Sequence, residues 1–344
     1  MKKPIRIAIN GFGRIGRCVF RSLYESQNEF NLQIVAINEL ADCKTIAHLC
    51  KYDSTHGRFS KEIKVVDDCL SIDNQDIQIL HHDNLDDLPW ESLSVDIVME
   101  CTGEYSDREA AEKHLKAGAK KVLLSQPGKS QSDVDATIVY GYNHHKLIKS
   151  DKIISNASCS TNCIIPVIQT LEESFGIESG VITTIHSAMN DQPVIDAYHH
   201  TDLRKTRSAM HSIIPVDTGL AQGIDRLFPE LKGKFEAQAM RVPTINVSAI
   251  DLSVVVKEDV SVSLINFALE TASDNAYEGI LGYSQEMLAS CDFNHDARSG
   301  IVDGLQTRVA GNRLVKILVW FDNEWGFSNR MLDVATEMAA FIEQ

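Results

Sequence analysis

The sequence lacks an apolar run long enough to cross a membrane, and it is poor in basic residues relative to acidic ones. Its 344 residues include 33 lysines and arginines against 48 aspartates and glutamates, which gives a formal net charge of −15 at pH 7. Surfaces that bind nucleic acid or anionic membranes need a basic face. We therefore expect neither a nucleic-acid partner nor a membrane partner, and the site of any anionic substrate must be locally positive.

Signal-peptide and disulfide patterns are missing as well. The N-terminal residues begin basic, but no apolar stretch long enough for a signal peptide follows them, so we expect a cytoplasmic protein. The eight cysteines have no disulfide-framework spacing, and a chain of this length does not need such cross-links, so we expect most of them to be reduced and structural. Cys159 and Cys163 lack the paired short spacings of a zinc site, which predicts no metal centre.

The composition is that of a soluble globular protein. Hydrophobic residues make up 44% and charged residues 24% of the chain, which contains no internal repeat and no low-complexity tract. A chain of this length suits two domains, each large enough to bury its own core.

A glycine-rich motif opens the first domain. The β-rich run 5–9 leads directly into the pattern G-x-G-x-x-G at residues 11–16, and a helical pattern follows. In this context the glycines allow a tight turn and let the backbone approach a pyrophosphate at a helix N-terminus. A second apolar run, 32–37, ends just before Glu39, whose carboxylate would hold a ribose 2′-hydroxyl and repel a 2′-phosphate. The pattern predicts NAD rather than NADP; the alternative is an ordinary glycine turn with a surface glutamate.

Three further apolar runs, 95–100, 121–124 and 136–140, alternate with polar or helical segments. That alternation is typical of a doubly wound parallel sheet, the Rossmann fold. The polar segments 101–103 and 125–128 come just after two of these runs, at the edge where such sheets bind ligands. Plain turns would have the same pattern.

The second half of the chain has a different periodicity. Apolar and polar side chains alternate in 246–256, and 179–184 and 314–321 are similar, so we expect an α+β domain with a largely antiparallel sheet. The segment 187–215 has little periodicity, and loops of that length are usually functional. An amphipathic pattern in 328–342 predicts a helix that closes the fold.

These patterns predict an α/β chain of two domains. We expect an NAD-binding Rossmann domain over 1–158, completed by a closing C-terminal helix over 323–344. The catalytic domain is expected over 159–322, so the boundary falls at Cys159.

The run 155–163 places a thiol, Cys159, among small hydroxyl and amide residues, and an apolar run follows it. This pattern predicts a helix that starts near Cys159 and is capped by Ser155, Asn156 or Ser158. Backbone N–H groups at a helix start favour a negative charge, so the thiol should ionise more readily than a free cysteine and act as a nucleophile. The residues of this run alone leave a buried, inert thiol equally open.

Six separated motifs, taken in order, resemble the glyceraldehyde-3-phosphate dehydrogenase family from end to end. They are INGFGRIGR (9–17), SNASCSTNC (155–163), DLRKTR (202–207), RVPTINV (241–247), DFNHD (292–296) and DNEWGFSNR (322–330). Within the family the chain looks most like the erythrose-4-phosphate dehydrogenase branch. The strings that point there are VAINELAD (35–42), HSAMND (186–191), DAYHHTDLR (196–204) and SIIPVDT (212–218).

The resemblance implies that Cys159 is the nucleophile and His186 its base. A thiolate adds to an aldehyde carbonyl, the thiohemiacetal gives hydride to NAD, and the resulting thioester is cleaved, with an imidazole moving the proton near pH 7. The implied cofactor-binding residues are Gly11, Gly13, Arg14, Ile15, Gly16, Glu39, Ser125 and Asn323. For a phosphorylated aldose substrate, the implied binding residues are Ser158, Ser160, Lys205, Thr218, Gly219 and Arg241. The resemblance also implies a homotetramer.

Three residues depart from the family's pattern. Lys205 stands where the family has an arginine, Met189 where a threonine is usual, and Asp217 where a hydroxyl residue is usual. Because Met189 removes a hydroxyl donor and Asp217 adds negative charge, we expect water rather than inorganic phosphate to release the thioester. Erythrose 4-phosphate would then become 4-phosphoerythronate, a step that in this branch feeds pyridoxal 5′-phosphate synthesis. The alternatives are the phosphorylating glyceraldehyde-3-phosphate dehydrogenase of glycolysis and, in another class, a non-catalytic NAD-binding regulator.

Overall fold

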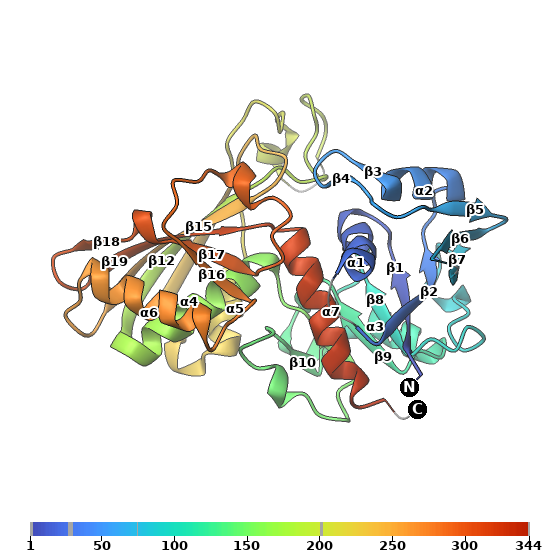
Figure 1. Ribbon diagram of the computed structural model, residues 1–344, viewed down its shortest axis with the longest axis horizontal. Helices are drawn as coiled ribbons and strands as arrows, with labels where there is room; N and C mark the ends of the chain where they lie inside the picture. Colours follow the sequence, from blue (N-terminus) through green and yellow to red (C-terminus); the bar gives the residue numbers. More distant parts are fainter. Residues whose placement is uncertain (1–2, 27–29, 74, 200–201, 343–344) are drawn as a thin grey trace. The chain divides into compact units, whose positions relative to one another are not determined.

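The computed structural model describes residues 3–26, 30–73, 75–199 and 202–342 (Figure 1). It divides into two compact units, the first made of Met1–Ser158 and Ser328–Gln344 and the second of Cys159–Phe327. Residues 200 and 201, within the string DAYHHTDLR, and residues 343 and 344, at the end of the expected closing helix, lie outside the described residues.

The first unit contains, in its described part, a nine-stranded sheet. Seven neighbouring strands run parallel, and the last two are added antiparallel at one edge. In spatial order they are β10 (Ala136–Thr137), β11 (Ile153–Ser155), β9 (Lys121–Leu124), β8 (Ile97–Glu100), β1 (Ile5–Asn10), β2 (Leu32–Asn38), β7 (Gln75–Leu80), β6 (Cys69–Ile72) and β5 (Lys64–Val66). This is the predicted Rossmann-like sheet. The run 136–140 contributes a shorter strand than its apolar length suggests.

Helices and a two-stranded hairpin complete the first unit. The helices are α1 (Arg14–Glu25), α2 (Cys43–Lys51) and α3 (Arg108–Lys116), and β3 (Tyr52–Asp53) pairs with β4 (Gly57–Arg58). Aspartates start two of the helices, because the side chain of Asp42 accepts from backbone N–H groups of α2 and Asp107 does the same for α3. One core cluster packs Ala8 and Val98 of the sheet around the fully buried Trp90.

The second unit is built on an eight-stranded sheet within its described residues. Its main path is β13 (Ile214–Val216), β14 (Phe235–Arg241), β12 (Ile177–His186), β15 (Ser248–Val256), β19 (Leu314–Phe321), β17 (Gly300–Asp303) and β16 (Leu281–Ser284), and β18 (Arg308–Ala310) pairs with β19. Only the pairs β12–β14 and β16–β17 are parallel among these strands. The prediction of a largely antiparallel sheet is confirmed.

One face of this second sheet is covered by helices. Figure 1 shows α4 (Cys159–Phe175), α5 (Leu220–Leu227) and α6 (Val262–Asp274) along that side, and α4 contacts β12, β15, β17 and β19. Alternate residues of β12 point to the other face, where Val181 is 54% exposed and Ile185 36% exposed.

The last long helix, α7 (Trp325–Ala339), starts in the second unit and ends in the first. Met331, Ala335 and Met338 are buried, as the amphipathic pattern predicts. Among the described residues, no helix has the length and apolar character needed to cross a bilayer. The short 3-10 helices are Leu85–Asp87, Gln131–Asp133, His144–Lys146, Leu203–Thr206, Pro229–Leu231, Ser290–Phe293 and Gly304–Gln306.

Candidate active site

A thiol and an imidazole face each other in the second unit. Cys159 is the first residue of α4, and its Sγ lies 3.8 Å from Nε2 of His186. His186 ends β12, and Arg241 ends the parallel neighbour β14 as its direct register partner. Because parallel strands end at the same edge of a sheet, the base and a cation are placed side by side next to the thiol.

The hydrogen bonds of His186 define its tautomer. Nδ1 lies 2.8 Å from the carbonyl oxygen of Ser187, which can only accept, so Nδ1 carries the proton. Nε2 is therefore the unprotonated nitrogen, and it is the one that faces Cys159. Burial lowers the pKa of His186 below its ordinary 6.5, which keeps the ring neutral and able to accept a proton.

The predicted ready ionisation of Cys159 is wrong for the structure without ligands. Burial raises the pKa of the thiol to about 11, and the backbone N–H groups of Ser160 and Cys159 oppose this shift without overcoming it. Of the three candidate caps of α4, Ser155 does not act as one. Its hydroxyl donates to the carbonyl of Gln126 at 2.7 Å and accepts from the N–H of Ala157 at 3.0 Å. A thiol with a raised pKa that lies beside the unprotonated nitrogen of His186 can pass its proton to that nitrogen.

A carboxylate that sequence reasoning missed, Asp191, bridges two predicted phosphate ligands. Its Oδ1 accepts from Nη1 of Arg241, and its Oδ2 lies 3.0 Å from Nζ of Lys205. Although burial acts to raise it, the pKa of Asp191 is lowered by the bonds from Arg241 and Lys205. The only signal in the sequence was the acid that ends the string HSAMND, five positions after the predicted base.

Thr218 and Gly219 stand at the start of α5. Gly219 is the N-cap residue, and the Thr218 hydroxyl accepts from the N–H of Leu220 at 3.3 Å. A side-chain carbon added at Gly219 would meet no atom within 4 Å, so the backbone there is open to a ligand. Of the three residues that depart from the family's pattern, Met189 and Asp217 are both exposed.

Asn323 is held by two serines that sequence reasoning also missed. Its Oδ1 accepts from the hydroxyls of Ser187 at 3.0 Å and Ser248 at 2.8 Å. Both serines are buried, and the N–H of Ser187 also donates to Ser248 Oγ at 3.0 Å. The amide oxygen of Asn323 is thus committed to the protein, and its NH2 group is the end that can donate to a ligand.

The first unit carries a cavity of about 280 Å3 at the ends of its central strands. Its walls are formed by the glycine-rich turn, the residues after β2, β7 and β8, and a few side chains. They are Asn10, Gly11, Gly13, Asn38, Glu39, Leu40, His82, Asp83, Leu85, Cys101, Thr102, Glu104 and Tyr105. Glu39 reaches back to the turn, because its Oε2 accepts from the N–H of Phe12 at 3.0 Å.

The turn at this cavity suits the pyrophosphate of a dinucleotide. Gly11 has a φ of 87°, and a side-chain carbon there would lie 2.6 Å from the backbone nitrogen of Thr102, so only glycine suits the turn. A side-chain carbon added at Gly13 would meet no atom within 4 Å. The turn leads into α1, whose first N–H groups can receive a pyrophosphate, and Glu39 is placed for a ribose hydroxyl.

Other predicted ligands of the first unit have structural partners. Arg14 forms an ion pair with Asp53, with Nη1 to Oδ2 at 2.5 Å. Gly16 allows close packing, since a side-chain carbon there would lie 2.2 Å from the carbonyl oxygen of Gly11. Ile15 is half-buried on α1, and Ser125 directly follows β9. Of the serines flanking the thiol, Ser158 ends the first segment of the first unit and Ser160 lies in the first turn of α4.

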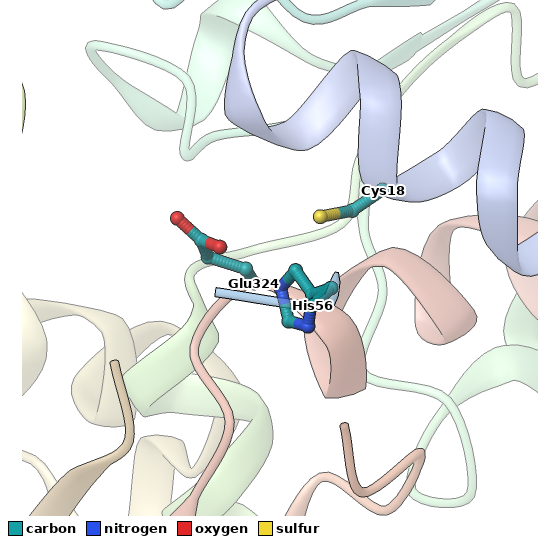
Figure 2. Close-up of side chains that lie close together, drawn as sticks. All are labelled: Cys18, His56 and Glu324. Atoms are coloured by element: carbon teal, nitrogen blue, oxygen red, sulfur yellow. The ribbon is translucent and has the colours of Figure 1, made fainter. Parts of the chain in front are cut away.

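Two possible metal ligands lie close together in the first unit. Figure 2 shows Cys18 of α1 and His56, from the turn between β3 and β4, whose ligand atoms lie within 4.8 Å of each other. Glu324, drawn in the same figure, belongs to the second unit. Within the described first unit this group supplies two ligands, whereas zinc sites take three or four from protein. We assign no metal to this pair.

Two family models match the chain. Residues 5–108 match the NAD-binding domain of glyceraldehyde 3-phosphate dehydrogenase, and residues 158–323 match the C-terminal domain described for the same enzyme. The first match includes the glycine-rich turn and Glu39, and the second includes Cys159 and His186. Together the two matches cover well over half of the chain.

Proposed function

The chain belongs to the glyceraldehyde-3-phosphate dehydrogenase family and is an NAD-dependent oxidoreductase; from this premise we propose that it oxidises D-erythrose 4-phosphate to 4-phospho-D-erythronate and releases the product with water. In the branch that the sequence resembles, 4-phosphoerythronate feeds the synthesis of pyridoxal 5′-phosphate, and we propose the same use of the product here. The rival within the family is the phosphorylating oxidation of glyceraldehyde 3-phosphate.

The Asp191 bridge is the observation that supports water over phosphate. Two cations, Arg241 and Lys205, face one carboxylate, which leaves one net positive charge among the three groups. That charge suits a single phosphoryl group, the ester of the substrate. A second, inorganic phosphate near the thioester would meet a carboxylate already bonded to both cations and would be repelled by it.

The thiol and the imidazole account for the covalent steps. As Sγ of Cys159 attacks the aldehyde carbon, its proton passes to Nε2 of His186, which returns it to the former carbonyl oxygen, and a thiohemiacetal with a free hydroxyl forms. Bound NAD supplies the acceptor for the hydride that leaves this carbon. His186 takes the hydroxyl proton of the thiohemiacetal as the thioester forms and releases it to solvent. It then takes a proton from the attacking water and passes that proton to the departing sulfur, which releases the acid and restores the thiol.

Location and assembly follow from the same proposal. The enzyme acts in the cytoplasm as a homotetramer. The exposed Val181 and Ile185 on the uncovered sheet face, and the exposed Val194, Ile195 and Tyr198 of the segment 187–215, support association between copies.

A substrate panel tests the reaction. Purified protein with NAD and erythrose 4-phosphate in phosphate-free buffer should form NADH, followed by absorbance, and added phosphate should not raise the rate. Faster turnover of glyceraldehyde 3-phosphate with a strict phosphate requirement would contradict the proposal.

The variant Asp191→Asn tests the bridge within the same assay. It keeps the shape of the side chain but removes the charge that occupies Arg241 and Lys205, so phosphate should now accelerate NADH formation by about tenfold. The matched control is Asp196→Asn, which removes an exposed carboxylate of the same segment whose ion pair is with Arg207 instead of Arg241 or Lys205. Equal phosphate stimulation in both variants would show that overall charge, and not the bridge, excludes phosphate.

A further inference from the structure

Three polar side chains form a row across the central strands of the first unit. Glu100 ends β8, Asn10 ends β1 and Asn38 ends β2, and Asn10 is the register partner of both others. Register partners on neighbouring strands point to the same face of a sheet. All three side chains are buried, with 1% of Asn10, 1% of Glu100 and 7% of Asn38 exposed.

The carboxylate of Glu100 accepts two hydrogen bonds at each oxygen. Oε2 accepts from Nδ2 of Asn10 at 2.6 Å and from Nε2 of His114 at 3.1 Å. Oε1 accepts from the backbone N–H of Thr102 at 2.8 Å and from the Thr102 hydroxyl. Donors thus surround a carboxylate that burial would otherwise make costly.

His114 is neutral in this arrangement. It lies on α3 with its side chain fully buried, and the indole N–H of Trp90 donates to its Nδ1 at 3.0 Å. An indole nitrogen can only donate, so Nδ1 carries no proton and Nε2 carries the one that Glu100 receives. The negative charge of the row therefore stays on Glu100.

The backbone of His82 fixes the other end of the row. Its N–H donates to Oδ1 of Asn38 at 2.9 Å, and its carbonyl accepts from Nδ2 of Asn38 at 2.9 Å. The same Nδ2 donates to Oδ1 of Asn10 at 2.8 Å. The side-chain amides of Asn10 and Asn38 therefore each have one possible orientation. The carboxylate of Glu100 defines the orientation of Asn10, and the backbone N–H and carbonyl of His82 define that of Asn38.

The row supports the cofactor cavity without Glu100 or His114 forming part of its wall. Asn10, Asn38, His82 and Thr102 line the cavity, and Thr102 packs against the glycine-rich turn, where the backbone at Gly11 tolerates no side chain. Through Thr102 and Asn10, the carboxylate of Glu100 reaches both sides of the turn that would receive the pyrophosphate.

We infer that Glu100 is a positioning residue for the binding of NAD. Its carboxylate fixes Asn10 and Thr102 at the wall of the cavity, and His114 holds that carboxylate in place. The role concerns the cofactor alone, so it stands whichever aldehyde the enzyme oxidises.

The substitution Glu100→Gln tests this role. Whichever way the new amide is turned, its NH2 group replaces an oxygen that received two donors, so the bonds to Thr102 or to Asn10 and His114 are lost. The dissociation constant of NAD, measured by isothermal titration calorimetry without substrate, should rise about tenfold or more. The KM of the aldehyde and the alkylation rate of Cys159 should stay within about twofold.

Asp96→Asn is the matched control. Asp96 is also buried, comes directly before β8 at the opposite end of that strand, and accepts from the N–H of Arg6 at 2.9 Å. Asp96→Asn removes one negative charge, as Glu100→Gln does, but next to the opposite end of β8, and it should leave the NAD affinity unchanged. An unchanged dissociation constant in folded Glu100→Gln, or an equal rise in Asp96→Asn, would overturn the inference.

A pair of substitutions at His114 decides the matter if Glu100→Gln does not fold. His114→Leu removes the donor to Glu100 and should raise the NAD dissociation constant about threefold to tenfold. His114→Gln can still donate to Glu100 and accept from Trp90, so it should restore most of the affinity. Wild-type affinity in His114→Leu, or no recovery in His114→Gln, would refute the role.

Discussion

Burial favours the neutral forms of Cys159 and His186, the proposed catalytic pair. Cys159 is buried at the start of α4, so its thiol is difficult to ionise, and His186 is buried at the end of β12, so its imidazole is difficult to protonate. At 3.8 Å the two groups can exchange a proton when a substrate arrives. Burial thus disfavours an ion pair between Cys159 and His186 before a substrate binds.

The pH dependence of the reaction should reflect both shifts. Catalysis needs neutral His186, whose pKa is lowered, so the acid limb of kcat/KM should have its midpoint below 6.5. Alkylation of Cys159 by neutral iodoacetamide, in the enzyme without substrate, needs the thiolate. Its rate should keep rising toward a midpoint near 11.

The control for the pH profile of kcat/KM is His186→Asn. This variant should lose the acid limb, and its turnover should fall by about a hundredfold or more. An alkylation midpoint near neutral pH in the wild type would contradict the neutral resting pair.

Single residues were also where sequence reasoning was least complete. It proposed Cys159 and His186 from their motifs but did not single out Asp191, Ser187 or Glu100. These act through bonds to partners 50, 136 and 90 positions away, respectively. Such pairings depend on which strands become neighbours, and no local pattern in one sequence encodes that.

At the scale of elements, the turn between β1 and α1 carries the cofactor signature. Periodicity and glycine spacing predicted this turn, the strands on either side of it and the acidic residue after β2, because each depends on local backbone preferences. The close approach of Gly11 to Thr102, which follows β8, depends instead on the order of strands in the sheet.

Gly11→Ala should therefore lower the free energy of unfolding by more than the positive φ of Gly11 alone predicts. A positive φ costs alanine about 1 kcal/mol, and the clash with Thr102 should add about 1 to 3 kcal/mol to the loss in free energy of unfolding, measured by urea titration. NAD affinity should fall with it.

Gly57→Ala isolates the first of these costs. Gly57 has a similar positive φ of 72°, but a side-chain carbon there would meet nothing within 4 Å. If both variants lose the same free energy of unfolding, the contact with Thr102 does not constrain the turn.

At the scale of the whole molecule, each unit brings one part of the chemistry. The first provides the dinucleotide cavity, and the second provides the thiol, the base and the cations. The division at Cys159 means that this residue, the proposed nucleophile, is the first residue of the second unit. Composition and alternation predicted the two fold types, whereas the number of strands in each sheet required the structure.

Association between copies should depend on the uncovered face of the second sheet. Val181→Asp places a charge in the centre of that face, where a partner would have to bury it, and should shift the protein toward smaller species in sedimentation velocity. Leu49→Asp is the control, because Leu49 is a similarly exposed apolar residue, at 42%, on α2 of the first unit. Identical sedimentation of wild type and Val181→Asp would exclude this face as an interface.

The Asp191 bridge has a consequence for the protein without substrate. Arg241 and Lys205 carry their own internal counter-ion, so the protein has little need to recruit one from solution. Ligands that bind only the folded state stabilise it by mass action, and here phosphate or sulfate in a buffer should contribute little of that protection. Because Asp191 already neutralises one of the two cations, the stability of the folded protein should depend less on the buffer anion than that of Asp191→Asn does.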